Sequence, residues 1–121
     1  MKVIIAGGRY FKPTQADINK IFCLHIEHVF TEIVSGGAPG ADAFGEVFAD
    51  CNNIKKTRFL ADWQRYGRGA GPIRNELMAQ HADAVILFKG GDGTNNMRLN
   101  AQKYGLKVLY DQDLDDSRQE A

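Results

Sequence analysis

The chain has 121 residues, of which 44% are hydrophobic and 25% are charged, and these values are ordinary for one globular domain. Its 15 basic and 15 acidic side chains give a formal net charge of zero, but residues 111–121 carry −4, so residues 1–110 carry +4. Such a mildly basic body lacks the strong positive charge expected of a protein whose affinity comes mainly from many DNA phosphates, and it favours a small anionic ligand.

Short β-branched runs alternate with longer amphipathic segments, which is typical of repeated strand and helix units with a parallel sheet. Thr14, with Asp17 three residues later, is a plausible N-cap of the first helix, and Gly105 is placed to end the last one. We therefore predict one α/β domain with a mainly parallel five-stranded sheet over residues 1–110, followed by an acidic, frayed tail over 111–121. The predicted strands are 3–6, 32–35, 56–60, 84–88 and 107–110, and the predicted helices are 14–30, 40–52, 72–81 and 94–104.

The loops after the first four strands are expected to meet at one edge of the sheet, where α/β proteins bind ligands. Two of them are rich in glycine: residues 35–42 read SGGAPGAD and residues 89–94 read KGGDGT. Glycine lets a ligand approach the main chain, and a helix that starts there presents N–H groups and a positive dipole end, so both loops are predicted to contact phosphate. Neither loop has the G-x-G-x-x-G or P-loop pattern, which disfavours ordinary NAD enzymes and ATPases.

Individual side chains at this edge have both a functional and a structural interpretation. Arg9 could hold a phosphate or form a surface salt bridge. Asp42 could accept a hydrogen bond from a ribose hydroxyl or complement a helix dipole, and Thr94 could bind phosphate or cap its helix. Trp63 lies in a long loop, residues 62–69, that is expected to form a mobile flap, where the indole could stack on a base or anchor the loop.

The two cysteines, Cys23 and Cys51, have neither CxxC nor Cys/His ligand spacing, so we predict no metal site, and reduced, mostly buried thiols. The apolar run at residues 1–6 is much shorter than a signal-peptide core, and no stretch approaches the roughly 18 residues that span a bilayer. A cytoplasmic protein without a membrane segment is therefore expected. No cofactor is predicted.

Five ordered blocks of the chain resemble the YspA-type, YpsA-related branch of the SLOG superfamily. They are VIIAGGR (3–9), VSGGAPGAD (34–42), ADW (61–63), GPIRNELM (71–78) and GGDGT (90–94). That superfamily includes the Lonely-guy phosphoribohydrolases, which activate cytokinins, and the DNA-processing protein DprA. The resemblance covers roughly residues 1–110 and implies a Rossmann-like three-layer fold that binds nucleotides or nucleotide-derived molecules.

The phosphoribohydrolases carry Arg-Lys-x-x-Met on a helix and then Pro-Gly-Gly-x-Gly-Thr-x-x-Glu, and their Arg and final Glu act on the N-glycosidic bond of a nucleoside monophosphate. Here RNELM keeps the arginine as Arg74, whereas GGDGTNNM places Met97 where the glutamate belongs. Because cleavage develops oxocarbenium character that a carboxylate stabilises, Met97 puts hydrolysis in doubt. Glu76, Asp42 or Asp92 could substitute for the missing glutamate, and Arg74 and Glu76 are the candidate catalytic residues.

We interpret the chain as a binding domain for a nucleotide or nucleotide-derived molecule, with a sensing or signal-binding role. A nucleotide N-glycosidase or phosphoribohydrolase is the first alternative. DprA-like binding of single-stranded nucleic acid is the second, and the near-neutral charge disfavours it. The predicted ligand-binding residues are Gly7, Gly8, Arg9, Ser35, Gly36, Gly37, Gly40, Asp42, Trp63, Arg68, Gly71, Pro72, Arg74, Asn75, Gly90, Gly91, Gly93 and Thr94.

The first predicted helix carries more apolar surface than one face of a sheet needs. Its apolar side chains include Ile18, Ile21, Phe22 and Ile26, and Val29 and Phe30 follow at its end. Self-association is also implied by the family resemblance, in which related domains pair through helices that flank the sheet. A homodimer is therefore expected.

Overall fold

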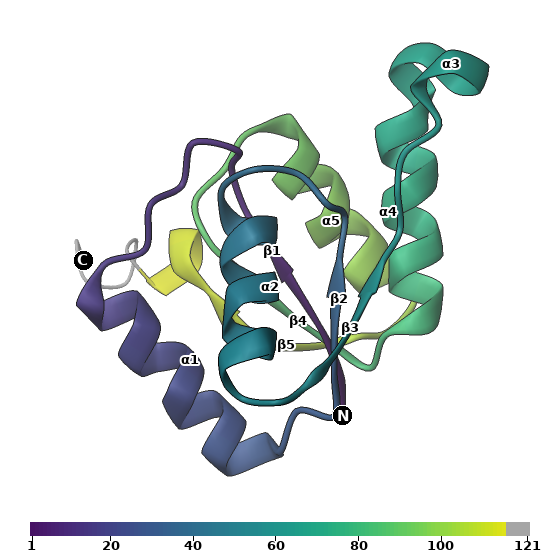
Figure 1. Cartoon of the computed structure of the whole chain (residues 1–121). Coiled ribbons are helices and arrows are strands. Elements are labelled where there is room, and N and C mark those ends of the chain that lie inside the picture. Colours follow the sequence, from purple (N-terminus) through teal and green to yellow (C-terminus); the bar gives the residue numbers. More distant parts are fainter. Residues whose placement is uncertain (116–121) are drawn as a thin grey trace.

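A computed structural model describes residues 1–115 of the chain as a three-layer α/β domain (Figure 1). Strands and helices alternate along the sequence, as the hydrophobic pattern predicts. The elements are β1 (Lys2–Ala6), α1 (Gln15–His28), β2 (Glu32–Ser35), α2 (Ala41–Cys51), β3 (Lys55–Arg58), α3 (Trp63–Tyr66), the 3-10 turn η1 (Gly67–Gly69), α4 (Ala70–His81), β4 (Ala84–Leu87), α5 (Asp92–Lys103) and β5 (Lys107–Asp111).

The five strands form one parallel sheet in the order β3-β2-β1-β4-β5. The chain builds outward from β1 to β3 and then crosses over to β4, so the strand order reverses between β1 and β4. Loops that leave neighbouring strands in opposite directions open a crevice at such a point, beyond the carboxyl ends of the strands. The topology therefore places a binding crevice between the loops after β1, β2 and β4.

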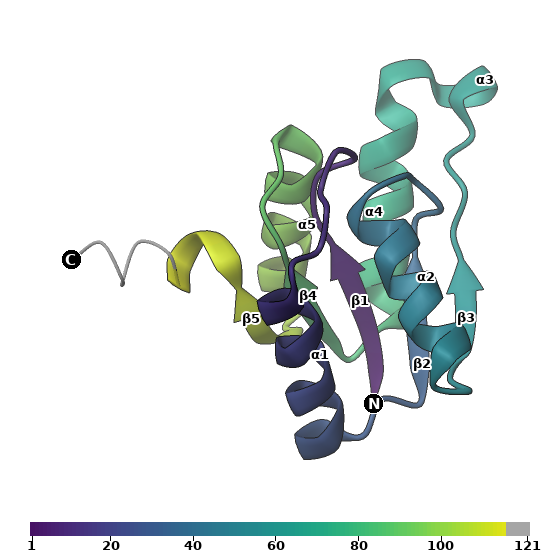
Figure 2. The ribbon, with the colours of Figure 1, turned by 60° about the vertical axis from the view of Figure 1, so that its left-hand side comes forward.

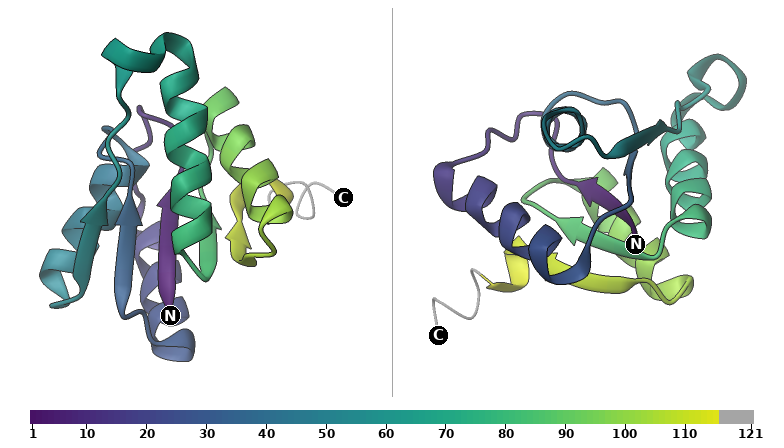
Figure 3. Two further views of the ribbon diagram at one scale, coloured as in Figure 1. Left: turned by 90° about the vertical axis from the view of Figure 1, so that its right-hand side faces the viewer. Right: turned by 60° about the horizontal axis from the view of Figure 1, so that its bottom comes forward.

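Alternate residues of the central strands fill two separate cores, because successive side chains of a strand point to opposite faces. Val3 and Ile5 of β1 pack with residues of α1 and α2 on one face. Ile4 and Ala6 pack with residues of α4 and α5 on the other face. The left view of Figure 3 shows α4 and α5 in front of the sheet. The expected three-layer architecture is confirmed.

The segment predicted as a long flexible loop, residues 62–69, is instead mostly helical. The side chain of Asp62 accepts a hydrogen bond from the N–H of Arg65 at 3.1 Å and so caps the short helix α3. The 3-10 turn η1 follows, and α4 begins at Ala70, two residues before the predicted start. Figure 2 shows α3 and the first turn of α4 extending beyond the carboxyl ends of the strands. The glycines at 67, 69 and 71 made this segment read as a loop in the sequence.

The first helix begins as predicted and ends earlier. Thr14 and Asp17 form a reciprocal capping box, in which the Asp17 N–H donates to Thr14 Oγ1 at 3.2 Å and the Thr14 N–H donates to Asp17 Oδ2 at 2.9 Å. The helix stops at His28 because Val29 adopts a left-handed conformation with φ of 53°. Gly105 has φ of 68° just after α5, which confirms its predicted role at that helix end.

Helix α1 buries only part of its apolar surface. Ile21 is fully buried against the sheet, whereas Phe22, Ile26 and Val29 are exposed. The expected homodimer stays a prediction. Cys23, also on this helix, is exposed, and so is Cys51 at the end of α2, which makes the prediction of mostly buried thiols wrong. Both cysteines fall on the sides of their helices that face away from the sheet, and the core on this face is filled by aromatic and aliphatic side chains.

Strand β5 extends to Asp111, one residue into the segment predicted as a tail. The Arg98 side chain of α5 holds Asp111 through two hydrogen bonds of 2.7 and 3.0 Å, and residues 112–115 continue as a helical turn. The rest of the predicted tail, 116–121, lies outside the described residues. Among the helices of residues 1–115, none has the length and apolarity needed to cross a membrane.

Candidate functional site

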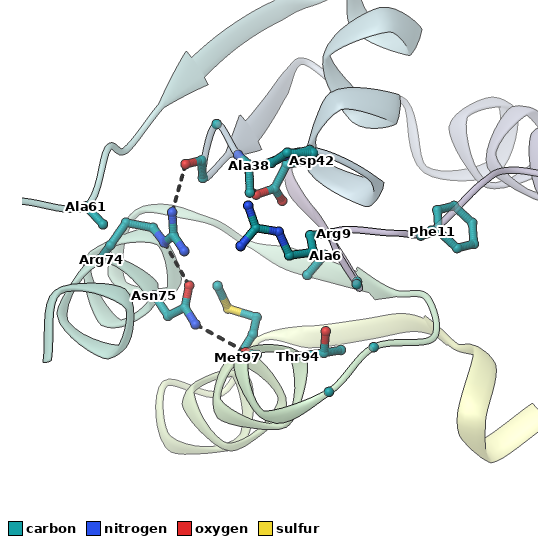
Figure 4. Close-up of a pocket in the computed structure, with 18 of the residues that line it drawn as sticks. Ala6, Arg9, Phe11, Ala38, Asp42, Ala61, Arg74, Asn75, Thr94 and Met97 are labelled. Carbon is teal, nitrogen blue, oxygen red and sulfur yellow. Dashed lines mark hydrogen bonds between the residues drawn. The ribbon is translucent and has the colours of Figure 1, made fainter. Parts of the chain in front are cut away.

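A pocket of about 1110 Å³ lies at the carboxyl ends of the central strands, where the strand order reverses. Its walls come from the loops after β1, β2, β3 and β4, from the start of α3, from the middle of α4 and from the first two turns of α5 (Figure 4). The buried side chains of Met78 and Met97, which also belong to the core beneath α4 and α5, line its inner part.

The structure brings thirteen of the predicted site residues together around this pocket. It adds residues that were not predicted to bind a ligand, among them Tyr10, Leu60 and Lys89. Tyr10 and Leu60 are large side chains in the loops that follow β1 and β3, and their place in these loops is the signal that could have identified them. The thirteen are Gly7, Gly8, Arg9, Gly36, Gly37, Asp42, Trp63, Arg74, Asn75, Gly90, Gly91, Gly93 and Thr94.

Six predicted site residues do not line the pocket: Ser35, Gly40, Arg68, Gly71, Pro72 and Glu76. Ser35 and Gly40 belong to the first glycine loop, residues 35–42, and stabilise it without lining the pocket. Arg68 is exposed on η1, and Pro72 is exposed in the first turn of α4. Gly71 lies behind the indole of Trp63, so that a Cβ atom there would be 3.4 Å from the ring.

Glu76, the second candidate catalytic residue, faces away from the pocket. Its carboxylate accepts a hydrogen bond from Lys103 Nζ at 3.2 Å, at the last residue of α5, and one from the hydroxyl of Tyr104, which caps that helix. The Tyr104 hydrogen bond, followed by the Lys103 hydrogen bond and charge, holds the pKa of Glu76 below its usual value. Residues two apart on an α-helix point in nearly opposite directions, so Arg74 and Glu76 cannot both reach the pocket. Asp92, the other alternative carboxylate, does not line the pocket either.

The first glycine loop, residues 35–42, is held together by hydrogen bonds within the protein. The N–H of Gly37 donates to Ser35 Oγ at 3.0 Å, the N–H of Ala38 donates to Asp42 Oδ2 at 3.1 Å, and the N–H of Ala41 donates to the Gly8 carbonyl at 3.2 Å. The Ser35 hydroxyl in turn donates to Glu46 at 2.8 Å. These donors are already satisfied without a ligand.

Gly40 explains why this loop needs glycine. Its φ is +79°, and a Cβ atom there would overlap the Gly8 carbonyl oxygen and lie 2.6 and 2.7 Å from main-chain atoms of Arg9. The residue is therefore required for the loops after β1 and β2 to pack together.

The second glycine loop, residues 89–94, has a different pattern of hydrogen bonds. The N–H of Lys89 donates to Gln112 Oε1 at 3.0 Å, and its carbonyl accepts from the N–H of Gly8 at 2.8 Å. The next five N–H groups, those of residues 90–94, donate to no acceptor within residues 1–115. A Cβ atom added at Gly91 or Gly93 would meet nothing within 4 Å. The second loop thus presents unpaired donors beside open space at the N-terminus of α5.

Thr94 adds a hydroxyl to this wall. The residue is only 4% exposed, and its Oγ1 has no hydrogen-bond partner among residues 1–115. Since no fully buried side-chain polar atom of these residues lacks a partner, this oxygen must be accessible from the pocket. Figure 4 shows the hydroxyl directed toward it.

Arg74 and Asp42 form the opposite wall. The Arg74 side chain donates from Nη1 to the Gly36 carbonyl at 2.7 Å and from Nε to Asn75 Oδ1 at 3.0 Å. Burial raises the pKa of Asp42, and the Ala38 N–H and the charge of Arg74 offset this effect only in part. The wall therefore presents a guanidinium next to a partly desolvated carboxylate.

Asn75, predicted to contact a ligand, uses both ends of its amide within the protein. Its Oδ1 accepts from Arg74, and its Nδ2 donates to Asn96 Oδ1 at 3.0 Å and to the Gly93 carbonyl at 3.3 Å. The residue is buried between α4 and α5. Its amide thus connects the second glycine loop to the arginine that holds the first one, and it positions Arg74.

Arg9 and Trp63 lie at the mouth of the pocket. Arg9 forms no ion pair or hydrogen bond through its side chain within residues 1–115, so the surface salt bridge considered for it is not formed with these residues. Figure 4 shows its guanidinium extending over the pocket. Trp63 is 60% exposed and lines the same space, which leaves most of one indole surface open to a ligand.

Comparisons with known proteins add to this description. Residues 1–66 match the model of the YspA, cpYpsA-related SLOG family. The Gene 61 protein of Mycobacterium phage D29 is 31% identical over 117 aligned residues, which cover 89% of this chain and 94% of that protein.

Among solved structures, the fold is similar to the X-ray structure of DNA processing protein A (DprA) from Streptococcus pneumoniae, with a TM-score of 0.70 and 21% identity. The similarity covers 90% of this chain and 49% of the DprA chain, so this chain spans about half of DprA. It confirms the predicted Rossmann-type fold.

Proposed function

The chain belongs to the YspA, cpYpsA-related SLOG family, and on that premise we propose that its pocket binds a nucleotide or nucleotide-derived molecule through a phosphate at the second glycine loop. The observation that carries the proposal is the run of five unpaired N–H groups at residues 90–94 beside the unpaired hydroxyl of Thr94. A phosphate offers several acceptor oxygens and a negative charge, which suit such donors at the start of a helix.

The charged side chains around the pocket support an anionic ligand. Arg9, Arg74 and Lys89 line it, and Asp42 is the one acidic residue among the described lining residues. The positive charges therefore outnumber the negative ones. The side chain of Arg9 extends over the pocket without a competing carboxylate partner, and a guanidinium can bind two phosphate oxygens at once.

The size and the apolar lining of the pocket support a nucleoside attached to that phosphate. A volume of about 1110 Å³ leaves room beyond a phosphate group. Trp63, Tyr10 and Leu60 line the same pocket and are mostly exposed, so they offer flat or apolar surface on which a base can stack.

A second candidate function, hydrolysis of the N-glycosidic bond, is favoured by Arg74 and Asp42, which share the wall opposite the second loop. Met97 cannot supply the carboxylate of the phosphoribohydrolases, and Glu76 points away, so Asp42 would have to act on the sugar. Release of free base from nucleoside monophosphates, lost in Arg74→Ala, tests this function. If no base appears after long incubation at high protein concentration, the chain does not hydrolyse those substrates.

Titration calorimetry tests the binding proposal with nucleoside mono- and diphosphates, ADP-ribose, cyclic nucleotides, inorganic phosphate and a single-stranded DNA oligonucleotide. We expect at least one mononucleotide-sized ligand to bind. Thr94→Val should weaken that binding about tenfold, since it removes one hydrogen bond to a charged group, whereas Thr94→Ser keeps the hydroxyl and should bind like the native protein. Absence of binding to every ligand, or equal affinities of the native protein and Thr94→Val, would overturn the proposal.

A further inference from the structure

We infer that the wall formed by Asp42 and Arg74 binds the 2′,3′-diol of a ribose, so that the pocket selects ribonucleotides over 2′-deoxyribonucleotides. This inference rests on the proposed function, because it takes the phosphate to lie at the second glycine loop. It names the class of sugar that the rest of the pocket accepts.

Asp42 and Arg74 keep hydrogen-bonding capacity that the protein does not use. A carboxylate offers about four lone-pair positions, and Asp42 accepts from the main chain alone: from the Ala38 N–H at Oδ2 and, more weakly, from the Gly36 main chain. A guanidinium has five N–H donors, and Arg74 uses two of them, one toward the Gly36 carbonyl and one toward Asn75. Acceptors and donors therefore remain side by side on one wall of the pocket.

The two side chains approach each other across Gly36, which places them within reach of one small group. A Cβ atom at Gly36 would lie 2.6 Å from Arg74 Nη1 and 2.9 Å from Asp42 Oδ2. Glycine at this position is therefore needed for the arginine and the carboxylate to share the wall. The same geometry holds both side chains in place before any ligand binds.

A vicinal diol fits this pair better than a phosphate does. Each hydroxyl can donate to the carboxylate and accept from the guanidinium, so two neighbouring hydroxyls satisfy both partners. A phosphate at this wall would be repelled by the Asp42 carboxylate, whose pKa is raised by burial. The wall thus complements a neutral, hydroxyl-rich group.

The opposite wall explains why that group is a ribose. Gly90, Gly91, Gly93 and Thr94 line the pocket from the α5 side, and Asp42 and Arg74 line it from the α2 and α4 sides (Figure 4). A nucleotide carries its phosphate and its diol on the same sugar ring, at opposite ends. One molecule can therefore satisfy both walls only if the diol is present.

The test compares the four ribonucleoside 5′-monophosphates with their 2′-deoxy counterparts by titration calorimetry, with inorganic phosphate as a probe of the phosphate site alone. The native protein should bind the ribonucleotide of its preferred base about 10- to 100-fold more tightly than the deoxy form. In Asp42→Asn, which keeps an acceptor for the Ala38 N–H, this ratio should fall at least about fivefold, while the affinity for inorganic phosphate is retained. Thr94→Val is the matched control, and it should weaken both series equally and leave the ratio unchanged.

Equal affinity for ribo and deoxy forms in the native protein, or an unchanged ratio in Asp42→Asn, would overturn the inference and leave the proposed function standing. If neither series nor inorganic phosphate binds, both fail together. Circular dichroism checks that the variants fold. Should Asp42→Asn not fold, Arg74→Lys replaces it, because a lysine lacks the planar set of donors and should lower the same ratio.

Discussion

The two glycine-rich loops follow β2 and β4, the strands on either side of β1, yet the protein pairs their main-chain donors to different extents. In the first loop, the N–H groups of Gly37, Ala38 and Ala41 bond to oxygens of the protein itself. In the second loop, five successive N–H groups have no acceptor within residues 1–115. Glycine content alone therefore does not identify a phosphate site. A site also needs donors that the fold leaves unpaired.

The largest effect on stability is expected from Gly40→Ala in the first loop. The new methyl group would overlap the Gly8 carbonyl in a backbone conformation with φ of +79°, and we expect a loss of about 3 kcal/mol or more in the free energy of unfolding. Urea denaturation measures it. Gly105→Ala is the matched control, because its φ is also positive at 68° but nothing lies within 4 Å. A loss no greater than that of the control would show that close packing does not require this glycine.

The next effect compares the two hydroxyls of the loops. Ser35→Ala leaves the Gly37 N–H without its acceptor and removes one of the hydrogen bonds to the buried Glu46, so it should cost about 1 to 3 kcal/mol. Thr94→Val removes a hydroxyl that has no partner among residues 1–115 and should change stability by less than about 0.5 kcal/mol. Thermal and urea unfolding of both variants give the comparison. Similar losses in the two would contradict the contrast between the loops.

Low pH should weaken the contact between the first loop and Glu46, whose carboxylate accepts a hydrogen bond from the Ser35 hydroxyl. Burial by itself raises the pKa of Glu46, but hydrogen bonds from Arg58 and Ser35 and the charge of Arg58 outweigh it and place the pKa below its usual value. A lowered pKa contributes stability that is fully present above the unfolded value of about 4.3 and is lost as the pH falls through the folded value.

Unfolding experiments between pH 7 and pH 3 on the native protein and Glu46→Gln measure this contribution. The variant should be less stable at pH 7, and the two curves should converge in acid. Parallel curves would mean that the ionised Glu46 does not support the loop.

A small effect on stability with the opposite sign is expected from Gly93→Ala in the second loop. Gly93 lies in the first turn of α5 beside open space, so alanine should raise stability by up to about 1 kcal/mol through its better helix propensity. Nucleotide binding should fall at least tenfold if the phosphate occupies that space. Gly45→Ala in α2 is the control, since its methyl group would press on Ile5 at 3.1 Å and should lower stability without changing binding. Unchanged nucleotide binding in Gly93→Ala would show that the phosphate does not bind beside this turn.

Local patterns determined much of the fold in advance. The β-branched runs predicted the strands, the Thr14 and Asp17 pair predicted the start of α1, and Gly105 predicted the end of α5. The failures had local causes too. Three glycines between residues 67 and 71 led to the prediction of a loop where the chain forms α3 and η1. The orientations of Cys23, Cys51 and Glu76 were not predicted correctly, because the exposed side of a helix depends on what the helix packs against.

By itself, the sequence determined the fold class and brought the loops to one edge of the sheet, because periodicity and the parallel order of strands follow from neighbouring residues. The tertiary structure decided that three N–H groups of the first loop are paired within the protein and that five successive ones of the second loop have no acceptor within residues 1–115. The reason is that the partners come from distant positions: Gly8 accepts from Ala41, and Gln112 accepts from Lys89. Arg74, which holds Gly36, is likewise 38 residues away from it. Contacts between such remote residues have no local signal, and they decide which part of the pocket is left for a ligand.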